Sequence, residues 1–153
     1  KYDIFWLEEP VAVDDLRGYQ MVATSTSIPI ATGEGEYTRY GYRDLIEDRC
    51  AAILQPDAMI MGGITEWMKV AAMAQAYDLP ISNHGPHNVH VHLLAAIPNG
   101  LIIEEYFTSG TQPVDGGMFI DPPVMKDGEI RPPDRPGLGI ELNDKAMAPF
   151  RTG

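Results

Sequence analysis

The sequence has a single cysteine, no long apolar segment and few basic residues. Cys50 has no second cysteine to pair with, so an internal disulfide is excluded and a reducing compartment, the cytoplasm, is expected. No apolar stretch approaches the roughly 18 residues that a membrane span needs, and the N-terminus shows no signal-peptide pattern. Acidic residues number 22 against 11 basic ones, giving a net charge of −11, and no basic cluster occurs. Because such a surface repels phosphates and anionic lipid, we expect neither nucleic acid nor a membrane as a partner.

The 153 residues have an ordinary globular composition, with 44% hydrophobic and 22% charged residues. This composition disfavours disorder, and the length suits one domain or one piece of a larger domain. The first residue is a lysine, and an apolar run begins at Ile4 without any lead-in. We therefore expect a fragment of a longer chain.

Five short apolar runs recur along the sequence, and a carboxylate or a histidine follows each of them. The runs are residues 4–7, 28–31, 52–54, 79–81 and 101–103, and the polar residues after them are Glu8, Glu34, Asp57, His84 and Glu104. Runs of this length are typical of strands that are buried on both faces. The polar residues recur every 20 to 27 positions, which indicates a structural repeat.

Segments with helical spacing separate these runs. In the clearest of them, residues 64–77, apolar side chains fall at intervals of three and four. Further helices are predicted over 16–23, 40–48 and 88–97. The alternation of strand and helix predicts an α/β fold with parallel strands, either a (β/α) TIM-type barrel or a doubly wound sheet. Five strand–helix units cannot close an eight-stranded barrel, so a barrel here would be partial.

The end of the chain has a different composition. Residues 1–107 carry the repeat, whereas residues 108–153 are dense in proline and glycine. We expect this tail to form ordered loops, with a turn and a short strand over 136–142. Met118 to Ile120 and Val124 are expected to anchor the tail against the rest of the protein.

The carboxyl ends of barrel strands all face one mouth, so the five polar residues are expected to converge there. Four carboxylates and one imidazole would then share a cavity. Carboxylates at such close range repel one another unless a cation lies between them. Oxygen ligands suit a hard divalent ion, so the pattern predicts a Mg²⁺ site.

Several short motifs in this order resemble the barrel domain of the enolase superfamily, mandelate racemase subgroup. The matching motifs are Trp6-Leu7-Glu8-Glu9-Pro10, Gly33-Glu34, Gln55-Pro56-Asp57, Gly62-Gly63-Ile64-Thr65, His84 and Glu104. The resemblance covers residues 3–105, and it implies the second half of the barrel, about five βα units. It also implies that the tail is the segment that packs on the barrel and returns to the family's capping domain.

The resemblance implies a role for each of the five polar residues. Glu8 and Glu34 would be the second and third Mg²⁺ ligands, and Asp57 and His84 would form a catalytic dyad. Glu104 would hydrogen-bond the substrate carboxylate or enolate. The family's first metal ligand and its Lys-x-Lys motif belong to earlier strands and have no counterpart here, so the chain alone is expected to be inactive.

The implied chemistry is removal of a proton alpha to a carboxylate, which gives a metal-stabilised enediolate. In this subgroup the same residues serve either dehydration of sugar acids or racemisation of 2-hydroxy acids. Residues 33–43 resemble the polar loop of the acid-sugar dehydratases, so dehydration to a 2-keto-3-deoxy acid is favoured. Asn83, His87, Arg39 and Tyr37 are the candidate substrate-binding residues, because a polyol acid needs many hydrogen bonds.

Alternative ligands lie next to the preferred ones. Glu9 and Glu36 compete as metal ligands, and Glu105 competes with Glu104. A zinc site built from His84, His87, His90 and His92 is disfavoured, because a helix beginning near residue 88 points two of them to different sides.

Two further hypotheses concern the whole protein. One is a barrel-derived binding protein that has lost catalysis, and the other is a doubly wound domain that is complete within 153 residues. The partner expected otherwise is a small sugar acid or 2-hydroxy acid. The family resemblance also implies a homo-oligomer.

Overall fold

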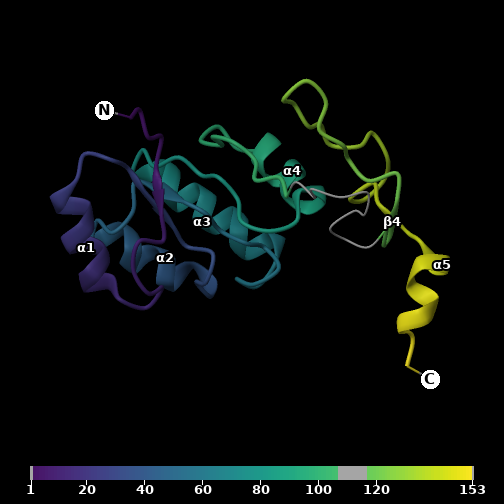
Figure 1. The fold of residues 1–153 in the computed structure, drawn as a ribbon, viewed down its shortest axis with the longest axis horizontal. Coiled ribbons are helices and arrows are strands. Elements are labelled where there is room, and N and C mark those ends of the chain that lie inside the picture. Colours follow the sequence, from purple (N-terminus) through teal and green to yellow (C-terminus); the bar gives the residue numbers. More distant parts are fainter. Residues whose placement is uncertain (1, 107–116, 153) are drawn as a thin grey trace.

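The computed structural model describes residues 2–106 and 117–152 (Figure 1). Its elements follow the chain in the order β1 (Leu7–Glu8), α1 (Leu16–Ser25), β2 (Ile30–Thr32), α2 (Thr38–Glu47), β3 (Ile53–Leu54), α3 (Ile64–Ala76), α4 (His87–Ala95), β4 (Phe119–Ile120), β5 (Glu141–Leu142), α5 (Asp144–Met147) and the 3₁₀ helix η1 (Ala148–Phe150). The four helices predicted in the repeat are confirmed, with ends that move by one to two residues.

The strands pair in parallel and in chain order. β1 pairs with β2 and β2 pairs with β3, and single bridges then join Leu54 to Ile81 and Ile81 to Gly100. A doubly wound sheet would reverse this order at a switch point, whereas a barrel keeps it. The partial barrel is therefore confirmed for the repeat, and the doubly wound alternative is wrong.

Two strand predictions need correction. The first strand begins at Leu7 rather than at residue 4, because the preceding residues have no neighbouring strand to bond with and are largely exposed. The fourth and fifth apolar runs contribute only the isolated bridges at Ile81 and Gly100. An apolar run thus predicts burial more reliably than it predicts a full ladder of hydrogen bonds.

The helices cover the sheet with large buried side chains. Trp67, Tyr19 and Tyr42 are the bulkiest of these, and none of them has measurable exposure. The four residues predicted to share a face of α3, Trp67, Val70, Ala71 and Ala74, are all buried. Cys50 lies in the same core, and its burial raises the pKa of the thiol, as expected for an inert cysteine.

The tail forms a small antiparallel pair, β4 with β5, followed by α5 and η1. Figure 1 shows β4 and α5 at the opposite end of the molecule from α1. Two histidines of α4 tie the tail to the barrel, because His87 Nε2 lies 3.0 Å from Pro123 O and His92 Nε2 lies 3.0 Å from Leu138 O. The anchoring role expected for Val124 is wrong, since this side chain is 74% exposed.

The boundary predicted between residues 107 and 108 lies outside the described residues. Within the part of the chain that the structure describes, no helix is long and apolar enough to cross a membrane.

Candidate active site

The side chains that follow the parallel strands converge on His84. Its Nδ1 lies 3.1 Å from Oδ2 of Asp57, although 27 positions separate the two residues. Asp57 is buried, and its Oδ1 accepts the backbone N–H of Met59 at 2.7 Å. A carboxylate can only accept, so the proton between the two groups belongs to Nδ1 of His84.

The other ring nitrogen of His84 faces two further groups. The Tyr106 hydroxyl lies 3.2 Å from Nε2, and Oε2 of Glu34 lies 3.6 Å from it. Burial, together with the negative charge of Glu104, raises the pKa of Tyr106 to about 12, so this phenol keeps its proton. With Nδ1 protonated, the Tyr106 hydroxyl donates to the lone pair of Nε2. Tyr106 was not among the predicted site residues, and only its position two residues after Glu104 could have indicated it.

Glu104 is fixed by the turn that follows His84. Its Oε2 accepts the N–H of Gly85 at 3.0 Å, and its own N–H donates to Oδ1 of Asn83 at 2.8 Å. The Asn83 carboxamide also donates to the Gly85 carbonyl. Asn83 is fully buried, so its bonds brace this turn, and the substrate contact predicted for it would require replacing them.

Gly85 allows the turn to approach Asp57. Its φ of +86° belongs to the left-handed region, and a Cβ at this position would collide with Oδ2 of Asp57. A glycine is therefore needed for the contact between His84 and Asp57.

Glu34 is held by a buried tyrosine. The Tyr42 hydroxyl donates to the carbonyl of Gly33 at 2.6 Å, and Gly33 itself has a φ of +126°. Tyr42 lies on α2, and Gly33 directly precedes Glu34 in the loop after β2. The helix that follows the loop thus sets the path of the backbone that carries Glu34.

Carboxylates gather on the Glu34 side of His84. Burial first, and then the charges of Glu34 and Glu8, raise the pKa of Glu9. Oε1 of Glu9 lies 3.4 Å from the Thr32 hydroxyl, whereas Oε2 of Glu8 accepts the indole N–H of Trp6 at 3.1 Å. Glu9 therefore stays an alternative to Glu8 as a ligand.

The donor chemistry at this end of the strands fits Mg²⁺, because carboxylate oxygens are the ligands that this ion prefers. Within residues 2–106 and 117–152, however, no three His, Cys, Asp or Glu side chains are grouped to hold a metal ion. A complete set of protein ligands is therefore not present among the described residues.

The alternative zinc site would need several of the four histidines to lie together, and among residues 2–106 and 117–152 they do not form such a group. The four histidines have separate partners: His84 pairs with Asp57, His87 with Glu105, His90 with Ala58 and His92 with Leu138.

Arg39 and His87 have partners outside the His84 cluster, and Tyr37 is largely exposed. The Arg39 guanidinium pairs with Glu66 at 2.7 Å. His87 has Oε2 of Glu105 at 2.6 Å from Nδ1 and a tail carbonyl at its other nitrogen. Tyr37 is 71% exposed at the start of α2. Their roles toward a substrate stay predictions.

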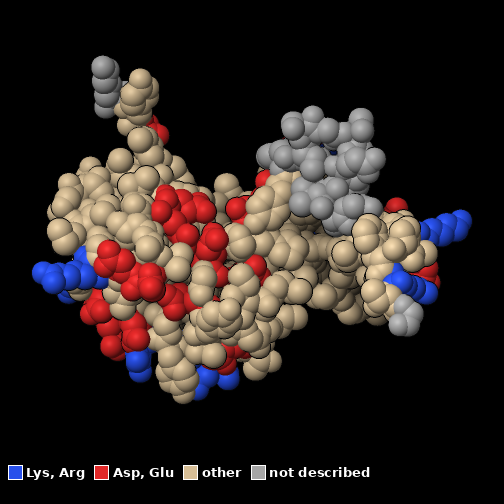
Figure 2. Space-filling view, turned by 60° about the horizontal axis from the view of Figure 1, so that its bottom comes forward, with Lys and Arg blue, Asp and Glu red and all other residues tan. Residues whose placement is uncertain are grey.

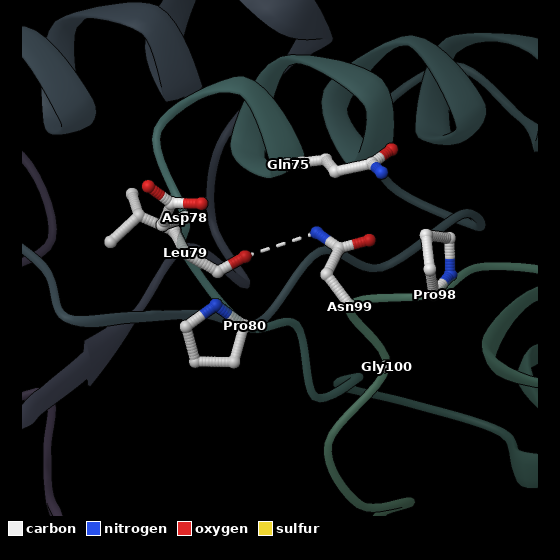
Figure 3. Close-up of a pocket in the computed structure, with 7 residues that line it drawn as sticks. All are labelled: Gln75, Asp78, Leu79, Pro80, Pro98, Asn99 and Gly100. Atoms are coloured by element: carbon white, nitrogen blue, oxygen red, sulfur yellow. Dashed lines mark hydrogen bonds between the residues drawn. The ribbon is translucent and has the colours of Figure 1, made fainter.

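A cavity of about 350 Å³ lies at the other end of the strands (Figure 3). Pro80 and Gly100 line this cavity, and each lies four residues before a residue of the candidate site, His84 and Glu104 respectively. Within this lining, the side-chain amide of Asn99 donates to the carbonyl of Leu79 at 3.0 Å. The cavity therefore does not include the His84 cluster.

The surface charge agrees with the sequence analysis. Figure 2 shows Asp and Glu side chains gathered over the part of the molecule that carries α1 to α3, with Lys and Arg at its margins.

Parallel strands in chain order, with carboxylates and a His–Asp pair after their carboxyl ends, define part of a β/α-barrel domain. The chain belongs to the enolase C-terminal domain-like family, whose model matches residues 1–146. The resemblance to the enolase superfamily is thereby confirmed.

Similar proteins include enzymes that act on sugar acids. The D-galactonate dehydratase of Pectobacterium atrosepticum is 34% identical over 155 residues, which cover 95% of this chain and 41% of that protein. The 3,6-anhydro-alpha-L-galactonate cycloisomerase of Streptomyces coelicolor is 31% identical and covers 99% of this chain and 41% of that protein. The structure of L-talarate dehydratase from Polaromonas sp. JS666, complexed with Mg and L-glucarate, superposes with a TM-score of 0.83 at 34% identity. The match covers 94% of this chain and 39% of that one, so the chain spans about two fifths of the length of these relatives.

Proposed function

We propose that this chain is part of a Mg²⁺-dependent hydro-lyase that dehydrates a sugar acid to a 2-keto-3-deoxy acid. The observation that carries the proposal is the pairing of His84 with Asp57 at the carboxyl ends of the strands, beside Glu34 and Glu104. Dehydratases among the similar proteins support the choice of reaction.

His84 is the proposed base. Asp57 holds the proton on Nδ1, which leaves the lone pair of Nε2 to receive the proton alpha to the substrate carboxylate. A positioned base of this kind contributes about 10²- to 10⁴-fold to the rate. Tyr106 occupies the same lone pair in the absence of substrate, so its hydroxyl has to give way to the substrate carbon.

Glu8 and Glu34 are the proposed Mg²⁺ ligands, with the remaining ligands coming from outside the chain. When bound, the ion would stabilise the negative charge that develops on the substrate carboxylate. In its protonated form, Glu104 is proposed to donate a hydrogen bond to the substrate carboxylate or to the enolate, since both of these groups only accept. The bond that Glu104 Oε2 accepts from Gly85 N–H holds the Glu104 side chain in place for this role.

In the proposed dehydration, the substrate loses one water, made of its α-proton and its C3 hydroxyl. The electron pair released by the α C–H bond forms a double bond to C3, and the C3 hydroxyl leaves with a proton supplied by His84. The resulting enol gains a proton at C3 and becomes the 2-keto-3-deoxy acid. Asn83, His87, Arg39 and Tyr37 stay proposed contacts for the hydroxyls of the substrate.

Racemisation of a 2-hydroxy acid is the second proposed reaction, because it uses the same base and the same α-proton. Cycloisomerisation is a third outcome, which the similar Streptomyces enzyme makes worth testing. We also propose a cytoplasmic homo-oligomer, on the basis of the lone cysteine and the family resemblance.

The test uses the full-length protein that carries these residues. It is incubated with Mg²⁺ and a panel of four- to six-carbon sugar acids, and products are followed by mass. Loss of one water from one acid, abolished by a chelator and by His84→Asn but not by His92→Asn, is the expected result. A product of unchanged mass would favour racemisation or cycloisomerisation, and no product and no α-proton exchange with solvent would support the non-catalytic hypothesis.

A further inference from the structure

We infer that His90 is a positioning residue that holds the two segments of the catalytic dyad together as a neutral imidazole. The inference rests on the proposed function of Asp57 and His84. His90 lies on α4, has no exposed surface and is not used by the proposed mechanism.

Both ring nitrogens of His90 have backbone partners. The N–H of Ala58 donates to Nε2 at 2.9 Å, and Nδ1 lies 2.9 Å from the carbonyl of Pro86. Ala58 directly follows Asp57, and Pro86 comes two residues after His84. One imidazole therefore connects the loop after β3 to the loop that begins α4.

The partners define the protonation state of His90. A carbonyl can only accept, so Nδ1 carries the proton, and an amide N–H can only donate, so Nε2 carries the lone pair. A doubly protonated ring would lose the bond from Ala58. Burial lowers the pKa of His90 despite the nearby charge of Asp57, whose Oδ1 lies 3.6 Å from Nε2; His84 and Glu104 are the other charged groups that face it.

The Asp57 loop is held from a second side as well. The indole N–H of Trp67 on α3 donates to the carbonyl of Pro56 at 3.0 Å. Backbone groups on both sides of Asp57 thus have buried side-chain partners, Trp67 before it and His90 after it. An apolar side chain at position 90 would fill the space but leave the buried Ala58 N–H without its acceptor, which is costly. The Pro86 carbonyl would keep the backbone N–H groups of Val89 and His90 as donors.

Two variants separate positioning from general stability. In His90→Gln the amide oxygen replaces Nε2 as the acceptor for Ala58, whereas in His90→Asn the shorter amide reaches only toward the Nδ1 partner, Pro86. Because misplacement of a catalytic group by about 1 Å can cost 10²-fold, we expect His90→Asn to lower kcat about 10- to 100-fold with KM unchanged. His90→Gln should recover most of this loss in the full-length enzyme.

Nitrogen-15 NMR of the histidines tests the inference without any substrate. In the wild-type full-length protein, we expect His90 as the Nδ1–H tautomer from neutral pH down to well below the range where exposed histidines titrate. The His84 Nδ1–H signal should shift in His90→Asn and return toward the wild-type position in His90→Gln.

An Nε2–H tautomer or an imidazolium at His90 at neutral pH would overturn the inference, even if neither variant folds. It would also be overturned if the two variants lost thermal stability equally and left the His84 signal and kcat unchanged. Failure of the proposed function has a different signature: no turnover in the wild type, with the His90 tautomer and the His84 signal still as expected.

Discussion

At the residue scale, the candidate site depends on close approaches that leave no space for an additional atom. Gly85 lets the turn after His84 reach Asp57, and Asn83 fills the inside of the same turn. The reactive groups therefore depend on neighbours that have no reactive group of their own.

Gly85→Ala is expected to separate His84 from Asp57. The left-handed backbone costs a residue with a Cβ about 1–2 kcal/mol, and the collision with Asp57 adds to this. We expect lower thermal stability and a loss of turnover, measured by calorimetry and steady-state kinetics. Gly63→Ala is the matched control, because Gly63 also has a positive φ, +92°, but has nothing within 4 Å of an added Cβ. Equal turnover in both variants would contradict the role of the close approach.

Tyr106→Phe is expected to free Nε2 of His84 for the substrate. The hydroxyl lies 3.2 Å from this nitrogen and has to leave it before the substrate carbon can approach. A hydrogen bond contributes about 0.5–1.5 kcal/mol, so its removal should raise kcat/KM by about 2- to 10-fold. Steady-state kinetics measures this, and Tyr77→Phe, at an exposed tyrosine, should leave kcat/KM unchanged. An unchanged kcat/KM in Tyr106→Phe would show that Tyr106 does not act on His84.

The strand pattern predicted that Asp57 and His84 lie at one end of the barrel, and the family resemblance implied that they form a pair, which the structure contains. Neither predicted the bonds of Asn83 or His90, because these depend on the exact path of the turns. Arg39 is a further example: it was predicted as a substrate contact from the resemblance of its loop to that of the dehydratases, and its ion pair with Glu66, 27 positions further along the chain, was not predicted.

At the element scale, an ion pair joins α2 to α3. Glu66, in the first turn of α3, accepts the backbone N–H of Arg39 at 3.0 Å, and it also pairs with the Arg39 guanidinium and with Lys69. These bonds, the backbone N–H first, lower the pKa of Glu66 from 4.5 to about 2. The start of α2 is thereby held against the start of α3.

Glu66→Gln is expected to lose a pH-dependent part of the stability. A carboxylate whose pKa is lower in the folded state stabilises the fold above its ordinary pKa of 4.5, and this contribution disappears as the pH falls toward 2. The wild type should therefore unfold at a higher temperature than Glu66→Gln at pH 7, and the difference should shrink below about pH 4.5. Circular dichroism at a series of pH values measures it, with exposed Glu47→Gln as the control. A difference that is constant with pH would contradict the ion pair.

At the scale of the whole molecule, the apolar runs and the helical spacing between them predicted the order of β1 to β3 and α1 to α4, although the last two runs contribute only isolated bridges. The tail was less predictable, because short strands such as β4 and β5 depend on pairing between distant segments rather than on local pattern.

Mg²⁺ is expected to stabilise the full-length protein. An ion at 100 times its Kd raises the free energy of unfolding by about 2.7 kcal/mol, which thermal unfolding with and without chelator detects. Glu34→Gln and Glu8→Gln should abolish this shift, whereas Glu9→Gln should keep it. The reverse pattern for Glu8 and Glu9 would make Glu9 the ligand.

The bulky core and the reactive groups occupy different parts of each strand–helix unit. Tyr19, Tyr42 and Trp67 pack between helices and sheet, whereas Glu34, Asp57 and His84 lie on the loops that follow the strands. Mutations in these loops that alter which molecule is recognised consequently leave most of the buried apolar surface intact. The loops can therefore acquire a different chemistry while the same fold is retained.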